Sequence, residues 1–181
     1  MLSAFVCKNL LFLVLIKITI AFSSETITVP VPKMNIGFIG CGTIASSIAT
    51  GLLRQREHPI ATIYTTRRSE KKSSQLVEKF PDKVHVCDDN QEICDKCELI
   101  FLCVLPEQVS SVLKSVTLAK DKILVSLVST SNLADLVHQS GLPSENCFKM
   151  ICLPAVAELE GTPLLVPKSN TYVPTLMATL G

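Results

Sequence analysis

The feature that most constrains the fold of this chain is an apolar run that leads directly into a glycine turn and an amphipathic segment, over residues 34–53. The turn reads Gly40-x-Gly42-x-x-Ala45. In a dinucleotide-binding fold the first small residue allows a tight turn, the second lets backbone N–H groups approach a pyrophosphate, and the third lets helix and strand pack closely. We therefore predict a strand, a phosphate-binding turn and a helix; the alternative is a glycine-rich turn without a ligand.

Further along the chain, apolar stretches alternate with helical patterns. We expect strands at residues 61–64, 83–87, 98–104, 122–128, 147–152 and 164–166, and helices at 69–80, 90–94, 107–116, 132–138 and from about residue 172. Continuous apolar runs such as 98–104 are typical of strands covered on both faces. The alternation with short loops predicts an α/β fold, a Rossmann-type doubly wound and mostly parallel sheet, in one domain over residues 34–181.

Charge and cysteine content limit the kinds of partner, cellular compartment and metal site that the sequence favours. The net charge of +1 gives no indication of a nucleic-acid or anionic-membrane partner. The eight cysteines are scattered, which favours a reducing compartment over a disulfide framework. Cys94 and Cys97 form a CxxC without a second pair at zinc spacing, so we expect no metal site. Cys103 lies within the predicted strand 98–104, where we expect an inert core thiol.

The first 22 residues have the layout of a targeting segment. Lys8 precedes an apolar run at 10–16, which is too short for a stable membrane span. The junction of Ala21 and Phe22 resembles that of plastid-targeting sequences in algae with secondary plastids, so we expect an organellar, plastid-type destination. Residues 23–33 read as a linker. The alternative is a cytoplasmic protein whose translation starts at Met34.

The residues after the predicted second strand bear on the choice of cofactor. An NAD-binding fold usually places Asp or Glu there to bind the ribose hydroxyls, but this chain has Thr66, Arg67 and Arg68. Guanidinium groups bind phosphate through paired, charge-assisted hydrogen bonds. The sequence thus favours NADP, with a solvated basic loop as the alternative. No grouping of acid, base or nucleophile stands out, so the catalytic residues are unassigned and hydride chemistry would rest on the nicotinamide.

Several motifs together resemble the N-terminal domain of pyrroline-5-carboxylate reductases. The motifs are the strand and turn at 34–45, Asp-Asn-Gln-Glu at 89–92, the strand ending in Val-Leu-Pro at 98–106, Ser-Leu-Val-Ser-Thr at 126–130 and Met-Ile-Cys-Leu-Pro-Ala at 150–155. Three positions depart from the family pattern: Thr43 replaces its usual Asn, Leu105 replaces its usual Lys, and Cys152 replaces its usual Asn. The last departure makes the match closer to a divergent, bacterial-type branch.

The resemblance implies roles for individual residues. The pyrophosphate would be held by Gly40, Cys41, Gly42, Thr43, Ile44 and Ala45, and the 2′-phosphate by Thr66, Arg67 and Arg68. Asn90 would contact the adenosine end. The nicotinamide side would be lined by Val104, Leu105 and Pro106, with Ser129 and Thr130 close by.

The resemblance also implies a reaction, which is hydride transfer from NADPH to a small cyclic imine in proline biosynthesis. In the family a C-terminal helical domain forms the dimer and much of the substrate pocket. We expect that domain to be absent from this chain, and a homo-oligomer only if such a domain exists. Two alternatives remain open: a deazaflavin-dependent NADP oxidoreductase, and a truncated, non-catalytic NADP-binding module.

Overall fold

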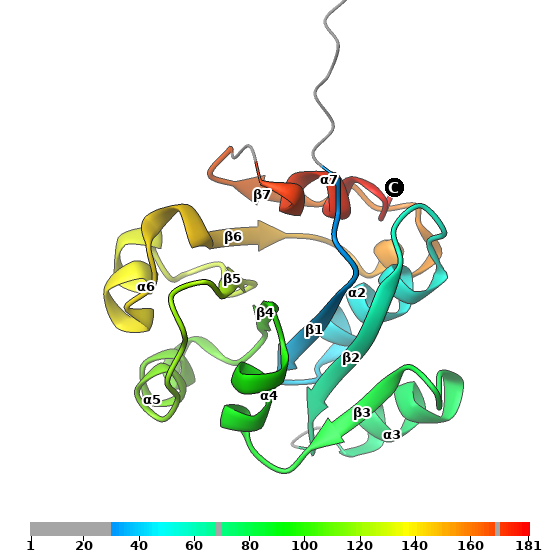
Figure 1. Ribbon diagram of the computed structural model, residues 1–181, viewed down its shortest axis with the longest axis horizontal. Coiled ribbons are helices and arrows are strands. Elements are labelled where there is room, and N and C mark those ends of the chain that lie inside the picture. Colours follow the sequence, from blue (N-terminus) through cyan, green and yellow to red (C-terminus); the bar gives the residue numbers. More distant parts are fainter. Residues whose placement is uncertain (1–29, 68–69, 169–170) are drawn as a thin grey trace, which may run out of the picture.

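The computed structural model of this chain describes residues 30–67, 70–168 and 171–181. The predicted targeting segment 1–22, most of the predicted linker and Arg68 lie outside the described residues. Figure 1 shows that the described chain is built around one twisted sheet with helices on both of its faces. No helix within these ranges combines the length and apolar character needed to cross a lipid bilayer.

The sheet has seven strands in the order β3-β2-β1-β4-β5-β6-β7. Neighbouring strands from β3 to β6 are parallel, and β7 pairs antiparallel with β6. The strands are β1 (Met34–Ile39), β2 (Ile60–Thr66), β3 (Val84–Cys87), β4 (Leu99–Leu102), β5 (Ile123–Ser126), β6 (Cys147–Ile151) and β7 (Leu164–Val166). This arrangement confirms the predicted doubly wound, mostly parallel sheet.

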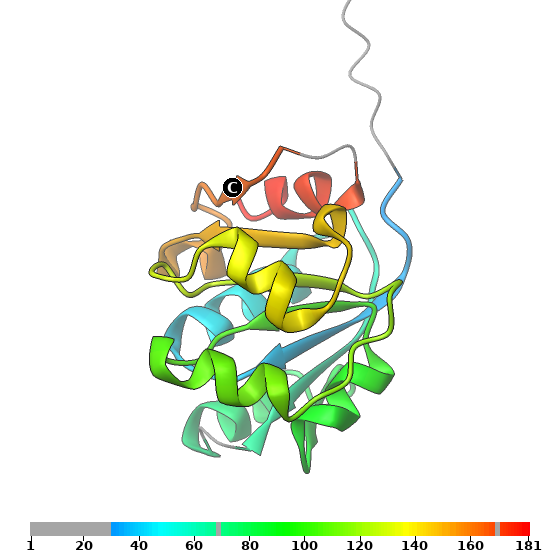
Figure 2. The same cartoon turned by 90° about the vertical axis from the view of Figure 1, so that its left-hand side faces the viewer.

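Helices cover both faces, as the side view in Figure 2 also shows. The helices are α2 (Thr43–Arg54), α3 (Glu70–Lys79), α4 (Asn90–Lys96), α5 (Val109–Lys114), α6 (Leu133–Ser140) and α7 (Tyr172–Ala178), with 3₁₀ turns η2 (Pro106–Gln108), η3 (Ser144–Asn146) and η4 (Pro154–Glu158). On one face α2, α3, η4 and α7 enclose a core that contains Ile48, Leu76 and Val156. On the other face α4, α5 and α6 enclose a second core that contains Ile93 and Leu136.

Burial of apolar side chains fixes which face each strand residue turns to. Phe38 of β1 and Phe101 of β4 lie side by side on one face, with ring centroids 4.9 Å apart and nearly parallel planes. Both rings are almost fully buried. Their neighbours Ile39 and Leu102 turn to the opposite core. Both faces of the central strands are therefore apolar, which explains the continuous hydrophobic runs in the sequence.

Three predicted elements are shorter in the structure than the sequence pattern indicated. The predicted strand 98–104 pairs only over β4, and the predicted strand 122–128 only over β5. Both end where Leu102 meets its last partners, Ile39 and Ser126. After Leu102 and Ser126 the chain turns toward the next helix. Strand pairing therefore stops there, although the apolar residues continue in the sequence. The predicted helix 107–116 is divided into η2 and α5.

Candidate functional site

The centre of the sheet contains a change in winding direction. β1 leads to β2 on one side, whereas its other neighbour, β4, leads to β5 on the opposite side. In open α/β sheets, ligands bind at the carboxyl ends of the strands at such a switch point. In the described chain, the predicted site residues lie at the end of β2 or in the loops and first helical turns that follow β1 to β5. The fold thus brings these residues to one edge of the sheet.

The first glycine of the turn is required by the protein's own backbone. Gly40 has a φ of +95°, a conformation that residues with a side chain rarely adopt. A Cβ atom at this position would lie 2.5 Å from the carbonyl oxygen of Cys103. The chain after β4 therefore passes directly over Gly40, and any larger residue would force the two loops apart.

The second glycine is different, because nothing in the described protein requires it. Gly42 has a φ of −75°, which any residue can adopt. A Cβ atom built on Gly42 would meet no protein atom within 4 Å. The open space beside this backbone is what a pyrophosphate needs if it is to approach the N–H groups of the turn.

Helix α2 begins at this open space with an electrostatic character that suits an anion. Gly42 is the N-cap and supplies no side-chain hydrogen bond, and no acidic residue lies in the first turn. The first N–H groups of a helix have no partner within the helix, and together with the helix dipole they favour negative charge. Ala45 is 2% exposed and packs into the core beneath, as its place in the motif predicts.

A pocket of about 340 Å³ opens between the glycine turn and the loop after β4. It is lined by Gly40, Cys41, Gly42, Cys103, Val104, Leu105 and Gln108. The structure therefore joins the predicted pyrophosphate turn to two of the three predicted nicotinamide-side residues, Val104 and Leu105. The other predicted residues in the described chain do not line this pocket; they are Thr43, Ile44, Ala45, Thr66, Arg67, Asn90, Pro106, Ser129 and Thr130.

Two of the lining residues were not predicted as site residues. Cys103 was expected to be an inert core thiol inside a strand; it follows the end of β4, is half-buried and lines the pocket. Gln108 was assigned only to a helix, but η2 turns it into the pocket, and its side-chain oxygen accepts a hydrogen bond from the Leu105 N–H at 3.4 Å. The signal that could have found Gln108 is its place two residues after Pro106, where the chain turns around the pocket.

The thiols of this pocket are not suited to act as nucleophiles. Burial raises the pKa of Cys41 above its ordinary value, and burial raises the pKa of Cys103 well above it. Both groups are therefore protonated at neutral pH, and a thiol is a much weaker nucleophile than a thiolate. The pocket offers backbone donors and apolar walls rather than a covalent catalyst.

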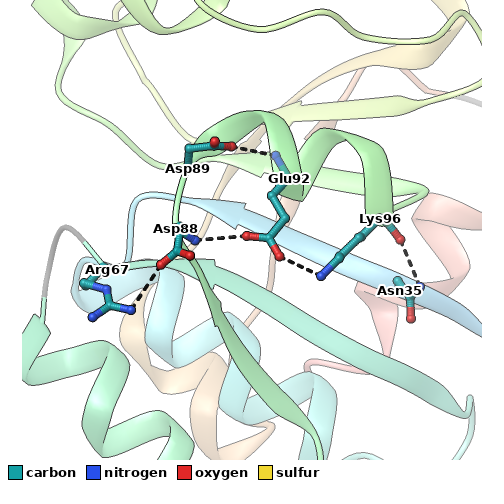
Figure 3. A network of polar contacts seen from close by, with 6 residues as sticks. All are labelled: Asn35, Arg67, Asp88, Asp89, Glu92 and Lys96. Carbon is teal, nitrogen blue, oxygen red and sulfur yellow. Dashed lines mark hydrogen bonds and ion pairs between the residues drawn. The ribbon is translucent and has the colours of Figure 1, made fainter.

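The end of β2 lies beside the glycine turn. Thr66 is buried, and its hydroxyl accepts a hydrogen bond from the backbone N–H of Gly40 at 3.2 Å. Arg67 is exposed and pairs with Asp88, which follows β3, with 3.2 Å between Nη2 and Oδ1. Figure 3 shows the guanidinium and this carboxylate facing one another, to the lower left of α4. Thr66 thus braces the turn, and Arg67 supplies the positive charge next to it.

Asn90 follows β3 and the loop with Ser129 follows β5, so they lie on opposite sides of the glycine turn along the sheet. Asn90 is the first residue of α4, which is capped by Asp89, whose carboxylate accepts a hydrogen bond from the Glu92 N–H at 2.8 Å. Ser129 and Thr130 are exposed. The carbonyl of Ser129 accepts a hydrogen bond from Lys149 Nζ at 3.0 Å, a contact between two elements that the sequence pattern could not foresee.

A larger hollow, of about 480 Å³, lies between α3 and β3. Its lining includes Arg67 but also the carboxylates of Glu70 and Glu78. Two acidic groups make this hollow a poor place for the pyrophosphate, because like charges repel. The smaller pocket at the glycine turn is therefore the better candidate for the pyrophosphate site. Within the described ranges, no group of three or more His, Cys, Asp or Glu side chains could hold a metal ion.

Comparisons with known proteins agree with this geometry. Residues 35–130 match the family described as "NADP oxidoreductase coenzyme F420-dependent". The pyrroline-5-carboxylate reductase of Arabidopsis thaliana is 30% identical over 119 residues, which are 65% of this chain and 42% of that protein. This chain therefore spans less than half the length of that relative.

Solved structures show the same fold. The 1-pyrroline-5-carboxylate reductase of Streptococcus pyogenes superposes with a TM-score of 0.66 at 20% identity, covering 82% of this chain and 56% of that one. The Plasmodium falciparum pyrroline carboxylate reductase, solved with NADP bound, gives a TM-score of 0.65 at 21% identity and covers 82% and 55%. At such identities the likeness establishes the architecture.

Proposed function

Because this chain belongs to the coenzyme F420-dependent NADP oxidoreductase family and carries an N-terminal domain of the pyrroline-5-carboxylate reductase type, we propose that it binds NADP(H) at the glycine turn and presents the nicotinamide for hydride transfer to a cyclic imine. The cofactor would supply the hydride itself. The work of the chain is to bind the two ends of the cofactor, to orient it along the sheet edge and to keep water from one of its faces.

The observation that carries this proposal is the open space at Gly42. The protein's own packing does not require a glycine there, and a Cβ would meet nothing within 4 Å. The uncapped start of α2 directs its N–H groups toward the same region. A ligand with a negative group that must approach the backbone closely accounts for both features, whereas a purely structural turn accounts for neither.

The remaining residues would divide the cofactor between them. Arg67, with Arg68 beside it in sequence, would hold the 2′-phosphate. Thr66 would hold the glycine turn in place through its hydrogen bond with the Gly40 N–H. Val104 and Leu105 would form an apolar wall on the nicotinamide side, in a pocket that Gln108 also lines. Asn90 would lie toward the adenosine end. No residue of this set carries a carboxyl, imidazole or thiol group that could act as a general acid, so the catalytic residues are left unassigned.

Binding is tested by titrating the purified chain with NADPH and following nicotinamide fluorescence. We expect saturable binding to the unmodified chain. In Gly42→Val a branched side chain would occupy the space of the pyrophosphate, and binding should be lost while the far-ultraviolet circular dichroism stays unchanged. Unaltered NADPH binding by a folded Gly42→Val protein would show that the turn is not the cofactor site.

The cyclic imine is a separate part of the proposal and needs its own experiment. Because this chain spans 42% of the Arabidopsis relative, a chimera is the most direct test: residues 34–166 would replace the matching N-terminal part of that enzyme. We expect the chimera to oxidise NADPH in the presence of pyrroline-5-carboxylate, and the same chimera with Gly42→Val to be inactive. A folded chimera that binds NADPH but does not reduce the imine would contradict the substrate assignment.

The description of the matching family favours a second candidate, hydride exchange between NADP and a reduced deazaflavin. Cys152, which replaces an amide side chain of the pyrroline-5-carboxylate reductases, agrees with a different partner for the nicotinamide. Supplying the chain with oxidised NADP and a reduced deazaflavin, and recording the appearance of NADPH, distinguishes the two. Turnover of the deazaflavin without turnover of the imine would favour this second candidate.

A further inference from the structure

Asp88 stands in an unusual place for a site that is to bind a phosphate. It is the first residue after β3, and its carboxylate lies 3.2 Å from Arg67, the guanidinium that we assign to the 2′-phosphate. Both side chains are largely exposed, at 67% for Arg67 and 90% for Asp88. An ion pair so open to water contributes little to folding stability. Its position at the cofactor site therefore calls for an explanation other than stability.

The backbone that carries Asp88 is firmly placed. Glu92 accepts the backbone N–H of Asp88 through Oε2 at 3.0 Å and the ammonium of Lys96 through Oε1 at 2.6 Å. The helix that contains Glu92 is capped by Asp89 and is tied to β1 by a hydrogen bond from Asn35 to the Lys96 carbonyl at 2.9 Å. Figure 3 shows these contacts as one connected network. The fold therefore holds the backbone of Asp88 next to Arg67.

The three acidic residues at the start of α4, Asp88, Asp89 and Glu92, are not equivalent. The carboxylate of Asp89 is engaged by the Glu92 N–H, and that of Glu92 by Asp88 N–H and Lys96. The carboxylate of Asp88 faces Arg67. Of the three, Asp88 is therefore the one whose negative charge bears directly on the group that would meet the phosphate.

We propose that Asp88 is a specificity-determining residue that competes with the 2′-phosphate of NADP for Arg67 and so moderates the preference for NADP over NAD. This inference rests on the proposed function. In the free protein the carboxylate neutralises the guanidinium. A bound 2′-phosphate must displace that carboxylate and remain close to it, whereas a ribose without the phosphate leaves the pair in place. Asp88 consequently penalises NADPH and leaves NADH nearly unaffected.

The test compares Asp88→Asn with Asp82→Asn. Asp82 precedes β3 and Asp88 follows it, so the two variants remove the same charge at opposite ends of one strand. Four extended residues separate the ends by more than the screening length at physiological salt. We expect Asp88→Asn to lower the dissociation constant for NADPH about two- to fivefold, the range available to an exposed ion pair, and to leave that for NADH unchanged. Asp82→Asn should change neither constant.

The same substitution in an Arg67→Gln background shows whether Asp88 acts through the guanidinium. We expect the gain in NADPH affinity to disappear there, because there is no longer a guanidinium to compete for. A gain that persists in Arg67→Gln, an equal effect of Asp82→Asn, or no effect of Asp88→Asn would each overturn the inference. So would weaker NADH binding by Asp88→Asn, which would make Asp88 a ribose acceptor. Failure of the proposed function is distinct, because then the unmodified chain would bind no NADPH.

Discussion

The backbone N–H of Gly40 donates a hydrogen bond to the side-chain hydroxyl of Thr66, with 3.2 Å between the nitrogen and the oxygen, and both residues are buried. Gly40 lies 26 positions before Thr66 and begins the turn after β1, whereas Thr66 is the last residue of β2. This one contact joins the segment that would bind the pyrophosphate to the segment that would bind the ribose end. It also gives an acceptor to the Gly40 N–H, which lies just after the last residue of β1.

Replacing Thr66 with Val tests the importance of that contact. The change keeps the shape of the side chain but leaves the Gly40 N–H buried without an acceptor, which typically costs about 1–3 kcal/mol. We expect the free energy of unfolding in urea to fall by that amount and NADPH to bind more weakly, because the turn loses its brace. Thr66→Ser retains the hydroxyl and should behave almost like the unmodified chain; if Ser and Val have the same effect, the hydrogen bond is not what matters.

Substitution of the two glycines of the turn should affect stability to very different extents. Gly40→Ala forces a side chain into a positive φ and against the Cys103 carbonyl, so it should destabilise the fold by about 1–3 kcal/mol or more. Gly42→Ala meets no protein atom and should change stability by only about 0.5–1 kcal/mol in either direction. Thermal unfolding without cofactor measures both effects. Equal destabilisation by the two variants would show that Gly42 is also required by the fold.

Alkaline pH should destabilise the protein through its buried cysteines. Burial raises the pKa of Cys87 to about 12 and that of Cys94 to about 11, from an ordinary value of 9.0. The unfolded chain therefore loses these protons first, and the free energy of unfolding stays level below about pH 9 and falls above it, by up to about 1.4 kcal/mol per pH unit for each thiol.

Urea titrations under reducing conditions between about pH 8 and pH 10.5 measure this fall directly. Cys94→Ala should reduce the slope from about pH 9 upward, whereas a Tyr172 substitution should reduce it only above about pH 10, because burial raises the pKa of Tyr172 from an ordinary value of 10.0 to about 12. A stability that is unchanged up to pH 10.5 in the unmodified chain would show that the thiols titrate normally in the folded state.

The order of the elements could be predicted from the sequence because it follows from local patterns. The glycine motif and the continuous apolar runs identify each strand of the sheet, and the winding rules then favour the parallel arrangement. The ends of β4 and β5 could not be predicted. Those depend on where Leu102 loses its partners Ile39 and Ser126, which is set by three strands far apart in the sequence.

The candidate site shows the same division between local and distant information. Gly40, Gly42 and Arg67 are recognisable from a motif or from the residue types after a strand. The role of Asp88 is not, because its charge acquires meaning only when β3 is placed beside β2. Gln108 and Cys103 were missed for a similar reason, since both enter the pocket through a turn whose geometry the sequence pattern does not specify.

Arg67→Ala should reduce the preference for NADPH. The guanidinium is exposed and near the glycine turn, and the loss of one charge-assisted hydrogen bond to a phosphate is expected to cost about 1.5–3 kcal/mol in binding. Because NADH lacks the 2′-phosphate, its dissociation constant should hardly change. Arg67→Lys keeps the charge but not the planar pair of donors, so its affinity for NADPH should lie between that of the unmodified chain and that of Arg67→Ala. An equal loss of NADH affinity in Arg67→Ala would indicate a general disturbance of the site.

The preference for NADP is tested most directly by the dissociation constants of the unmodified 181-residue chain for NADPH and NADH, measured by calorimetry under the same buffer and salt conditions. No acid follows β2 in the described chain until Glu70, which lies in α3, and Arg67 stands where a ribose-binding carboxylate would be expected in an NAD enzyme. We predict that NADPH binds at least about tenfold more tightly than NADH, a difference of about 1.4 kcal/mol. Equal constants, or tighter binding of NADH, would contradict it.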